Sequence, residues 1–256
     1  MAIEKQNRDF NEGVIAGRNP VMEALKAGTP IDKIFVMRGE REGSVVRIIG
    51  MAKERKIPIA EADRVKLDHI SGTDMHQGIV AYITPKQYVS VEELVEKARA
   101  KGEDPLLIIT ENLSDPHNFG AIIRTAEAAG AHGIIYSKNR SVGLTPTAVK
   151  SSAGAAMHMD IARVSNIAST IDKLKEMGLW IYGAAGEATA SIYETDMTGP
   201  AAIIIGNEGD GISRLTKEKC DFLVSIPMEG KVSSLNASVA AAIMIYESVR
   251  QRKAKK

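Results

Sequence analysis

Apolar and polar residues follow one another along this chain with two different periods. From residue 104 onward, short runs of consecutive apolar residues are separated by longer segments in which apolar residues recur every three or four positions. Continuous apolar runs such as 201–205 are typical of strands buried on both faces, and the segments between them are typical of amphipathic helices. The pattern therefore predicts an α/β fold in which helices cover both faces of a parallel sheet.

Strands and helices are expected to follow each other regularly in this part of the chain. The runs expected to form strands are 105–111, 133–138, 159–164, 179–185, 201–208 and 222–228. The segments expected to form helices are 118–130, 145–157, 166–178, 212–220 and 236–253. The last helix is apolar on all sides around 240–245, so it needs cover on every side. One side can pack on the sheet, and a second copy of the chain is expected to cover the other.

The first part of the chain has the pattern of a separate small α/β module. Asn19 can cap a helix that carries Pro20 in its first turn and ends at Gly28. Further runs predict strands at 31–37, 57–62 and 75–85, with a helix over 44–58. We therefore expect a flexible tail at 1–11, a first domain at 12–84, a linker with a charged helix at 85–103, and a second domain at 104–256.

The composition is that of a globular chain with balanced charge. Thirty-three basic side chains accompany thirty-two acidic ones, which argues against binding of polyanions by bulk charge and leaves room for a local basic surface. The single cysteine, Cys220, cannot form an internal disulfide, and we interpret it as a small half-buried side chain. The N-terminal segment is polar, and no apolar run reaches the roughly eighteen residues of a membrane span, so we expect a cytoplasmic protein.

Polar residues gather directly after three of the expected strands. Open α/β sheets bind ligands at the carboxyl ends of their strands, because helix N-termini and free backbone groups converge there. In the first loop, Asn118 stands at a helix start, and Arg124 follows it in a helix of largely apolar or small residues. Asn118 is either a helix cap or a site residue, and Arg124 is either a solvated side chain or one that faces a polyanion.

The second loop, 206–211, contains three glycines around Asn207 and Glu208. Glycine allows positive φ and close backbone approach to a ligand, and a carboxylate held between glycines can accept from a hydroxyl or ammonium group. The spacing is GxxGxG after a late strand, so it does not match the nicotinamide-binding fingerprint of an oxidoreductase. The third loop places Ser234 and Asn236 before the last helix, with more hydrogen-bonding capacity than a helix cap requires.

In this order, the segments NFGAIIRT, GNEGDGIS and IPMEGKVSSLNASVAAAI resemble the three motifs of the SpoU (TrmH) family of RNA ribose 2′-O-methyltransferases. The N-terminal GRNPVMEAL is similar to the start of that family's L30e-like RNA-binding extension. The resemblance implies the α/β knot (SPOUT) fold, with a deep C-terminal trefoil knot, after an L30e-like domain. It also implies S-adenosyl-L-methionine as cofactor, a homodimer formed through the C-terminal domain, and RNA as substrate, with a guanosine of 23S rRNA as the nearest match.

The same resemblance assigns roles to individual residues. The residues expected at the cofactor site are Gly206, Asn207, Ile226, Met228, Gly230 and Leu235. The residues expected to be catalytic are Arg124, Asn118, Glu208, Ser234 and Asn236. Because an arginine is protonated at neutral pH, we interpret Arg124 as an electrostatic clamp on the developing alkoxide, with His117 as an alternative base.

Local basic residues are the candidates for contact with RNA. They are Arg18, Lys138, Arg140 and Lys150, and His76 is either structural or RNA-facing. No histidine or cysteine cluster has the spacing of metal ligands, so no metal is expected. Two alternatives stay open: a tRNA 2′-O-methyltransferase and a non-catalytic RNA-binding dimer. The presence of Asn118, Arg124, Glu208 and Asn236 speaks against the second.

Overall fold

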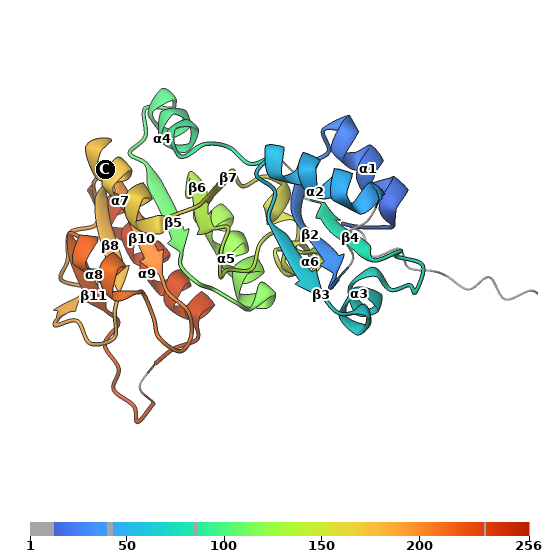
Figure 1. Ribbon diagram of the computed structural model, residues 1–256. Helices are drawn as coiled ribbons and strands as arrows, with labels where there is room; N and C mark the ends of the chain where they lie inside the picture. Colours follow the sequence, from blue (N-terminus) through green and yellow to red (C-terminus); the bar gives the residue numbers. More distant parts are fainter. Residues whose placement is uncertain (1–12, 40–42, 84–86, 233, 256) are drawn as a thin grey trace, which may run out of the picture. The chain divides into compact units, whose positions relative to one another are not determined.

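The computed structural model describes residues 13–39, 43–83, 87–232 and 234–255 (Figure 1). The chain forms two compact units, one up to Gln87 together with Leu144–Pro146, and one of Tyr88–Gly143 and Thr147–Lys256. The tail expected at 1–11 lies outside the described residues.

The first unit is built on a four-stranded sheet in the order β1-β4-β2-β3. Its strands are β1 (Val14–Ala16), β2 (Ile31–Met37), β3 (Ile59–Ala62) and β4 (Ile79–Ile83), and its helices are α1 (Arg18–Ala27), α2 (Ser44–Glu54) and α3 (Arg64–Ser71). Successive side chains of a strand point to opposite faces of a sheet. Ile34 and Val36 of β2 therefore enter the core beneath α1 and α2, whereas Phe35 enters the core beneath α3.

The beginning of α1 differs from the expectation, and its end agrees with it. The helix begins at Arg18 after Gly17, so Asn19 lies inside the first turn, and no side chain caps the helix. Gly28 ends it in the left-handed conformation, with φ 78°, which a glycine adopts without steric cost.

The second unit contains a parallel sheet of seven strands in the order β7-β6-β5-β10-β8-β11-β9. The strands are β5 (Leu106–Thr110), β6 (Gly133–Ser137), β7 (Ile161–Val164), β8 (Trp180–Ala184), β9 (Ala190–Ser191), β10 (Ala201–Ile205) and β11 (Phe222–Ser225). The helices are α4 (Val91–Ala100), α5 (Pro116–Ala128), α6 (Pro146–Ser151), the 3-10 turn η1 (Ala155–Met157), α7 (Ile167–Glu176), α8 (Arg214–Lys219) and α9 (Ala237–Ala254).

Helices cover both faces of this sheet (Figure 1). Side chains of α4 and α7 share one core with Leu107 and Ile109 of β5. Ile108 points to the other face, where α5 and α9 pack together, α9 contacts β10 and α5 contacts β6. In the part of the chain that the structure describes, no helix is long and apolar enough to span a membrane.

The segment expected to be a linker contributes to the core of the second unit. Val91, Leu94 and Val95 of α4 are buried against the sheet, and Ser90 and Glu93 form a capping box at the start of the helix. The charged residues of this segment occupy only the exposed face of an amphipathic helix. A linker over 85–103 is therefore the wrong interpretation for α4.

The helix expected over 145–157 is interrupted. Ala153 and Gly154 adopt positive φ values of 49° and 90°, which separate α6 from η1. A run of small residues has helical composition but little side-chain contact to hold one continuous helix, so the tertiary packing decides its path.

The order of the strands brings β5 and β10 together at the centre of the sheet. Their backbones pair in parallel from Leu106 with Ala201 to Thr110 with Ile205. After β5 the chain runs outward through β6 and β7, and it then returns to build β8, β10 and β11 on the other side. Such a reversal of strand order opens a crevice at the carboxyl ends of the strands.

Candidate functional site

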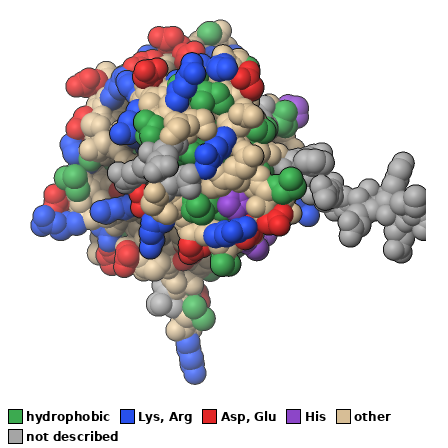
Figure 2. All heavy atoms as spheres, turned by 45° about the vertical axis from the view of Figure 1, so that its right-hand side comes forward, with side chains coloured by type: hydrophobic (Ala, Val, Ile, Leu, Met, Phe, Trp, Pro, Cys, Tyr) green, Lys and Arg blue, Asp and Glu red, His purple; other side chains and the backbone are tan. Residues whose placement is uncertain are grey.

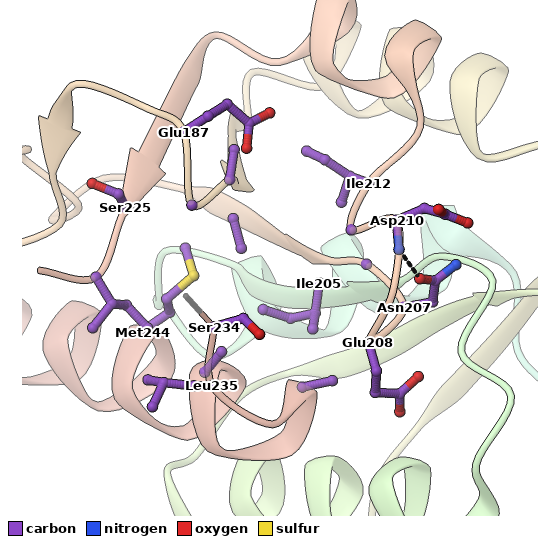
Figure 3. Close-up of a pocket in the computed structure, with 18 of the residues that line it drawn as sticks. Glu187, Ile205, Asn207, Glu208, Asp210, Ile212, Ser225, Ser234, Leu235 and Met244 are labelled. Carbon is purple, nitrogen blue, oxygen red and sulfur yellow. Dashed lines mark hydrogen bonds between the residues drawn. The ribbon is translucent and has the colours of Figure 1, made fainter. Parts of the chain in front are cut away.

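A cavity of about 400 Å³ lies at the carboxyl edge of the second unit's sheet (Figure 3). Its walls come from the segments after β8, β10 and β11 and from the first turns of α9. The lining residues are 184–187, 205–212, Lys217, 224–226, Met228, Ser234, Leu235, Ala237, Ala240 and Met244. Three separate parts of the chain therefore enclose one space of the size that small-molecule sites have, about 300–1,000 Å³.

The glycine-rich loop after β10 is closed by contacts within its own backbone. At its neck, Asn207 and Gly211 each donate a backbone N–H to the other's carbonyl oxygen over 3.2 Å. The Asn207 side chain accepts from the amides of Gly209, at 2.9 Å, and Asp210, at 2.6 Å (Figure 3). A Cβ atom on Gly206 would lie 2.0 Å from the carbonyl carbon of Gly211. Glycine is required at 206 because the loop folds back on itself there.

Asn118 joins the three motif segments. Its Nδ2 donates to Glu208 Oε1 over 2.6 Å, and its Oδ1 accepts from Asn236 Nδ2 over 3.0 Å. Asn236 in turn caps α9, with Oδ1 accepting from the backbone N–H of Ser238 at 2.9 Å. Asn118 is itself buried and is not a cap, because Asp115 caps α5 through the amide of His117. The amide of Asn118 thus fixes the glycine-rich loop and the start of α9 relative to α5.

Arg124 lies apart from this network in the single chain. It is exposed on α5 and is not among the residues that line the cavity. At about 100° per residue, the six residues from Asn118 to Arg124 turn the side chain through about 240° net, onto another side of the helix. Among the described residues, Arg124 has no hydrogen-bond or ion-pair partner. His117, also exposed, has its Nδ1 3.0 Å from the hydroxyl of Ser151.

The residues expected at the cofactor site fall into two groups. Gly206, Asn207, Ile226, Met228 and Leu235 line the cavity, and Gly230 is not among the lining residues. Of the residues expected to be catalytic, Glu208 and Ser234 line the cavity, whereas Asn118 donates to Glu208 and Asn236 donates to Asn118. Figure 3 shows Glu208 at the side of the cavity that faces α5.

The loop after β8 is a part of the site that the sequence analysis missed. Residues 184–187 line the cavity, and the carboxylate of Glu187 pairs with the ammonium group of Lys217. This hydrogen bond lowers the pKa of the Glu187 carboxyl. The same rule that selected the other loops applies here, because β8 is a further parallel strand whose carboxyl end meets the same edge.

The charged lining of the cavity is mostly acidic. Glu187, Glu208 and Asp210 contribute carboxylates, and Lys217 is the one basic residue among the described lining residues. An excess of carboxylates favours a ligand that carries positive charge. Within the described part of the chain, no three His, Cys, Asp or Glu side chains are grouped as metal ligands.

The candidate RNA contacts of the second unit lie in exposed or half-exposed positions. Lys138 and Arg140 follow β6, and Arg140 has a left-handed backbone with φ 58°. Lys150 is exposed in α6. The loop of Arg140 is tied to the segment after β5, because Val142 donates its amide to the carbonyl of Leu113 over 2.7 Å.

In the first unit, Arg18 at the start of α1 contacts the turn before β4, which contains His76. Arg18 donates its backbone N–H to Gln77 Oε1 over 3.1 Å and its Nε to the Gln77 carbonyl over 3.0 Å. His76 is buried, its Nδ1 accepts from the amide of Gly78 at 2.9 Å, and its Nε2 lies 2.9 Å from Asp68. Both ring nitrogens are occupied, so His76 has a structural role in this turn.

Comparisons with known proteins identify the family of this chain. The SpoU rRNA Methylase family model matches residues 105–246, which is more than half of the chain. The chain belongs to the SpoU (TrmH) family. A second family model, RNA 2'-O ribose methyltransferase substrate binding, matches residues 14–89. The protein is therefore an S-adenosylmethionine-dependent RNA methyltransferase of this family.

The relatives cover nearly the whole chain. YacO of Bacillus subtilis, whose name assigns it to the TrmH family of tRNA/rRNA methyltransferases, is 44% identical over 93% of this chain and 95% of its own length. A relative from Staphylococcus saprophyticus with the same family name is 44% identical over 95% of this chain and 97% of its own. The SpoU methyltransferase AviRb of Streptomyces viridochromogenes, solved with AdoMet, has a TM-score of 0.61 and 26% identity over 94% of this chain and 90% of its own. The α/β fold class of this family is confirmed, and the C-terminal knot stays a prediction.

The cavity fits the cofactor of the family. Its volume of about 400 Å³ suits a nucleoside-sized ligand, and the apolar side chains of Ile205, Ile226 and Leu235 line it beside the glycine-rich loop. The surplus of lining carboxylates suits the positive charge of a sulfonium group.

Proposed function

We propose that this protein methylates a ribose 2′-hydroxyl in RNA, and that its substrate is a guanosine of 23S rRNA. The observation that carries the proposal is the network of Glu208, Asn118 and Asn236, which joins the three motif segments beside an acidic cavity. The match of residues 14–89 to a ribose methyltransferase substrate-binding model supports the ribose as the acceptor. A non-catalytic RNA-binding dimer has no use for this polar network beside a closed cofactor loop.

We assign cofactor binding to those cavity residues that the motifs also predict. The residues are Gly206, Asn207, Ile226, Met228 and Leu235, with Gly230 nearby in sequence. When bound, S-adenosylmethionine supplies the methyl group as an electrophilic sulfonium carbon. The protein then has to align the acceptor and stabilise the negative charge that develops on its oxygen. Glu208 and Ser234 lie on the cavity wall, and Asn118, which itself accepts from Asn236, holds Glu208 in place.

We assign the stabilisation of the 2′-oxygen to Arg124, acting in the site of a second copy of the chain. Arg124 is exposed and points away from the side of α5 that carries Asn118. The adjacent helix α9 exposes Val239 and Tyr246, two turns apart on one side, with 46% and 49% of their surface accessible. An exposed apolar stripe next to the site supports a homodimer through α9.

We assign the contacts with RNA to local basic residues. Figure 2 shows basic and acidic side chains interspersed on one face of the molecule, in keeping with a net charge of +1. Arg18, Lys138, Arg140 and Lys150 are the candidates, and the last three are exposed or half-exposed. Replacing a side chain that contacts a phosphate should make the slope of log K for RNA binding against log salt concentration less steep by about one.

The main experiment locates the methyl group in RNA. The protein is incubated with labelled S-adenosylmethionine and with 23S rRNA or tRNA, and the RNA is hydrolysed with alkali. A 2′-O-methyl group blocks alkaline cleavage, so label in an alkali-resistant dinucleotide of 23S rRNA is the expected result. Label in tRNA alone favours the alternative substrate, and label in mononucleotides contradicts ribose methylation.

Two variants test the role of Arg124. Arg124→Ala should keep its affinity for the cofactor and lose at least about a hundredfold in turnover. Losing one group that stabilises charge in the transition state typically lowers kcat by about this factor. Arg99→Ala is the control, because Arg99 is exposed on α4, donates to the carbonyl of Met177 and does not line the cavity. Loss of cofactor binding together with turnover contradicts the assigned role.

Mixed dimers test which copy supplies Arg124. Arg124→Ala chains are combined with Gly206→Ala chains and assayed at a cofactor concentration well below the weakened Kd of Gly206→Ala, where each variant alone is expected to have little activity. If Arg124 acts across the dimer, one of the two sites in a mixed dimer is intact and activity returns. If it acts within its own chain, neither site is intact and mixing restores nothing.

A further inference from the structure

Glu111 is a buried carboxylate that the proposed reaction does not use. It follows β5 directly, only 7% of its surface is accessible, and its backbone amide donates to the carbonyl of Ile205 over 2.9 Å. It is not among the residues that line the cavity. A buried carboxylate is costly unless hydrogen bonds compensate it, so its partners indicate its purpose.

Three donors from the start of α8 converge on this carboxylate. The backbone N–H of Ser213 lies 2.8 Å from Oε2, and the hydroxyl of Ser213 lies 3.0 Å from Oε1. The hydroxyl of Thr216, itself fully buried, donates to Oε1 over 2.7 Å. The Ser213 hydroxyl also caps α8 by accepting from the amide of Thr216. The carboxylate thus holds the first turn of α8 at the end of β5.

The segment between β5 and α5 therefore anchors the glycine-rich loop at two points. Glu111 holds the residue at which the loop ends, Ser213, and Asn118 holds Glu208 within the loop. The loop that is held at these two points supplies residues 206–212 of the cavity wall. Only two backbone hydrogen bonds, between Asn207 and Gly211, close the loop upon itself. The position of Ser213, where the loop ends, therefore helps to decide where the cavity wall lies.

We propose that Glu111 is a positioning residue that presets the glycine-rich loop for the cofactor before the cofactor binds. This inference rests on the proposed cofactor site. A loop that is already in its bound conformation loses less entropy on binding, and its ligand binds more tightly as a result. Glu111 touches no reacting group, so its loss should weaken cofactor binding and leave the chemical step unchanged.

Glu111→Gln is the principal test. The amide keeps the shape of the carboxylate but places an N–H₂ group where one of the three donors now points. The expected result is a Kd and a KM for S-adenosylmethionine about tenfold higher than those of the wild type, since about 1.4 kcal/mol corresponds to a factor of ten. The kcat at saturating cofactor should stay within about twofold.

Two further variants separate positioning from general stability. Glu247→Gln removes the charge of another carboxylate with 7% accessible surface, on α9 away from the cavity lining, and should lower the melting temperature without changing the Kd. Thr216→Val removes one donor to Glu111 and keeps the side-chain shape, and should raise the Kd by about threefold. This second variant keeps the test valid if Glu111→Gln does not fold.

The outcomes are distinct from those that test the reaction. An unchanged Kd in both Glu111→Gln and Thr216→Val overturns the inference, and so does an equal rise of Kd in Glu247→Gln. A fall in kcat with an unchanged Kd also overturns it, because Glu111 would then act in the chemical step. A wild type that binds the cofactor but transfers no methyl group to RNA counts against the proposed function alone.

Discussion

Replacing Gly206 by alanine tests the closed geometry of the glycine-rich loop, which we propose to form a wall of the cofactor site. The added Cβ would lie 2.0 Å from the carbonyl carbon of Gly211, 2.2 Å from its oxygen and 2.3 Å from the amide nitrogen of Ile212. All three atoms belong to the backbone, so no side-chain rotation relieves the contact. The neck of the loop therefore has to open.

The cost of this opening follows from the bonds at the neck. Two backbone hydrogen bonds join Asn207 and Gly211, and each contributes about 1 kcal/mol net. Their loss amounts to about 2 kcal/mol, which corresponds to a Kd for S-adenosylmethionine roughly thirtyfold weaker. The expected melting temperature falls only slightly, because the loop lies at the edge of the sheet and not in its core.

Isothermal titration of the cofactor measures this effect. Gly199→Ala is the matched control, because Gly199 has no positive φ and its nearest neighbour, Trp180 Cδ1, is 3.8 Å from the position of an added Cβ. Gly199→Ala should bind like the wild type. Binding by Gly206→Ala within about threefold of the wild type would refute the reasoning that the closed loop forms the cofactor wall.

Three further outcomes are expected. Arg252→Leu should destabilise the protein to urea by about 3 kcal/mol, because its guanidinium donates to three backbone carbonyls at the amino ends of β5 and β10, whereas exposed Lys253→Met should cost little. Burial raises the pKa of the Cys220 thiol to about 12, whereas a thiol in the unfolded chain titrates at about 8.5. At pH 8, iodoacetamide should therefore label the folded chain over a hundredfold more slowly than the urea-unfolded chain. Equal rates would contradict the burial of Cys220. Tyr246→Asp should shift the mass measured by light scattering from dimer to monomer, and an unchanged dimer would place the interface elsewhere.

The sequence predicted most elements of the second unit because their apolar residues form continuous runs. Ile203, Ile204 and Ile205 are buried on both sides in β10, as the run 201–205 indicates. The pattern failed where side-chain spacing carries little information. The small residues of 145–157 do not reveal the break at Ala153, and the charges of α4 conceal its buried face.

The candidate site was predicted in part. Glu208, Ser234 and the residues expected at the cofactor site, other than Gly230, line one cavity, and Asn118 joins the loops. Glu187 was missed because the loop after β8 lacks the clustered glycines or polar side chains that mark the other loops. Glu111 was missed because a carboxylate at the end of a strand is usually exposed to solvent. Its hydrogen-bond donors lie 102 and 105 positions further along the chain, so the sequence does not show that they meet.

The amino-acid sequence alone determined the α/β class, the family and the identities of the motif residues, because these depend on local periodicity and on residue types at fixed spacing. Only the tertiary structure decided that β10 lies between β5 and β8, since strand order depends on contacts between distant segments. That order brings Glu111 and Asn118 to the glycine-rich loop. It also directs Arg124 away from the cavity of its own chain, because a helix fixed at Asn118 has one possible direction for a side chain six residues later.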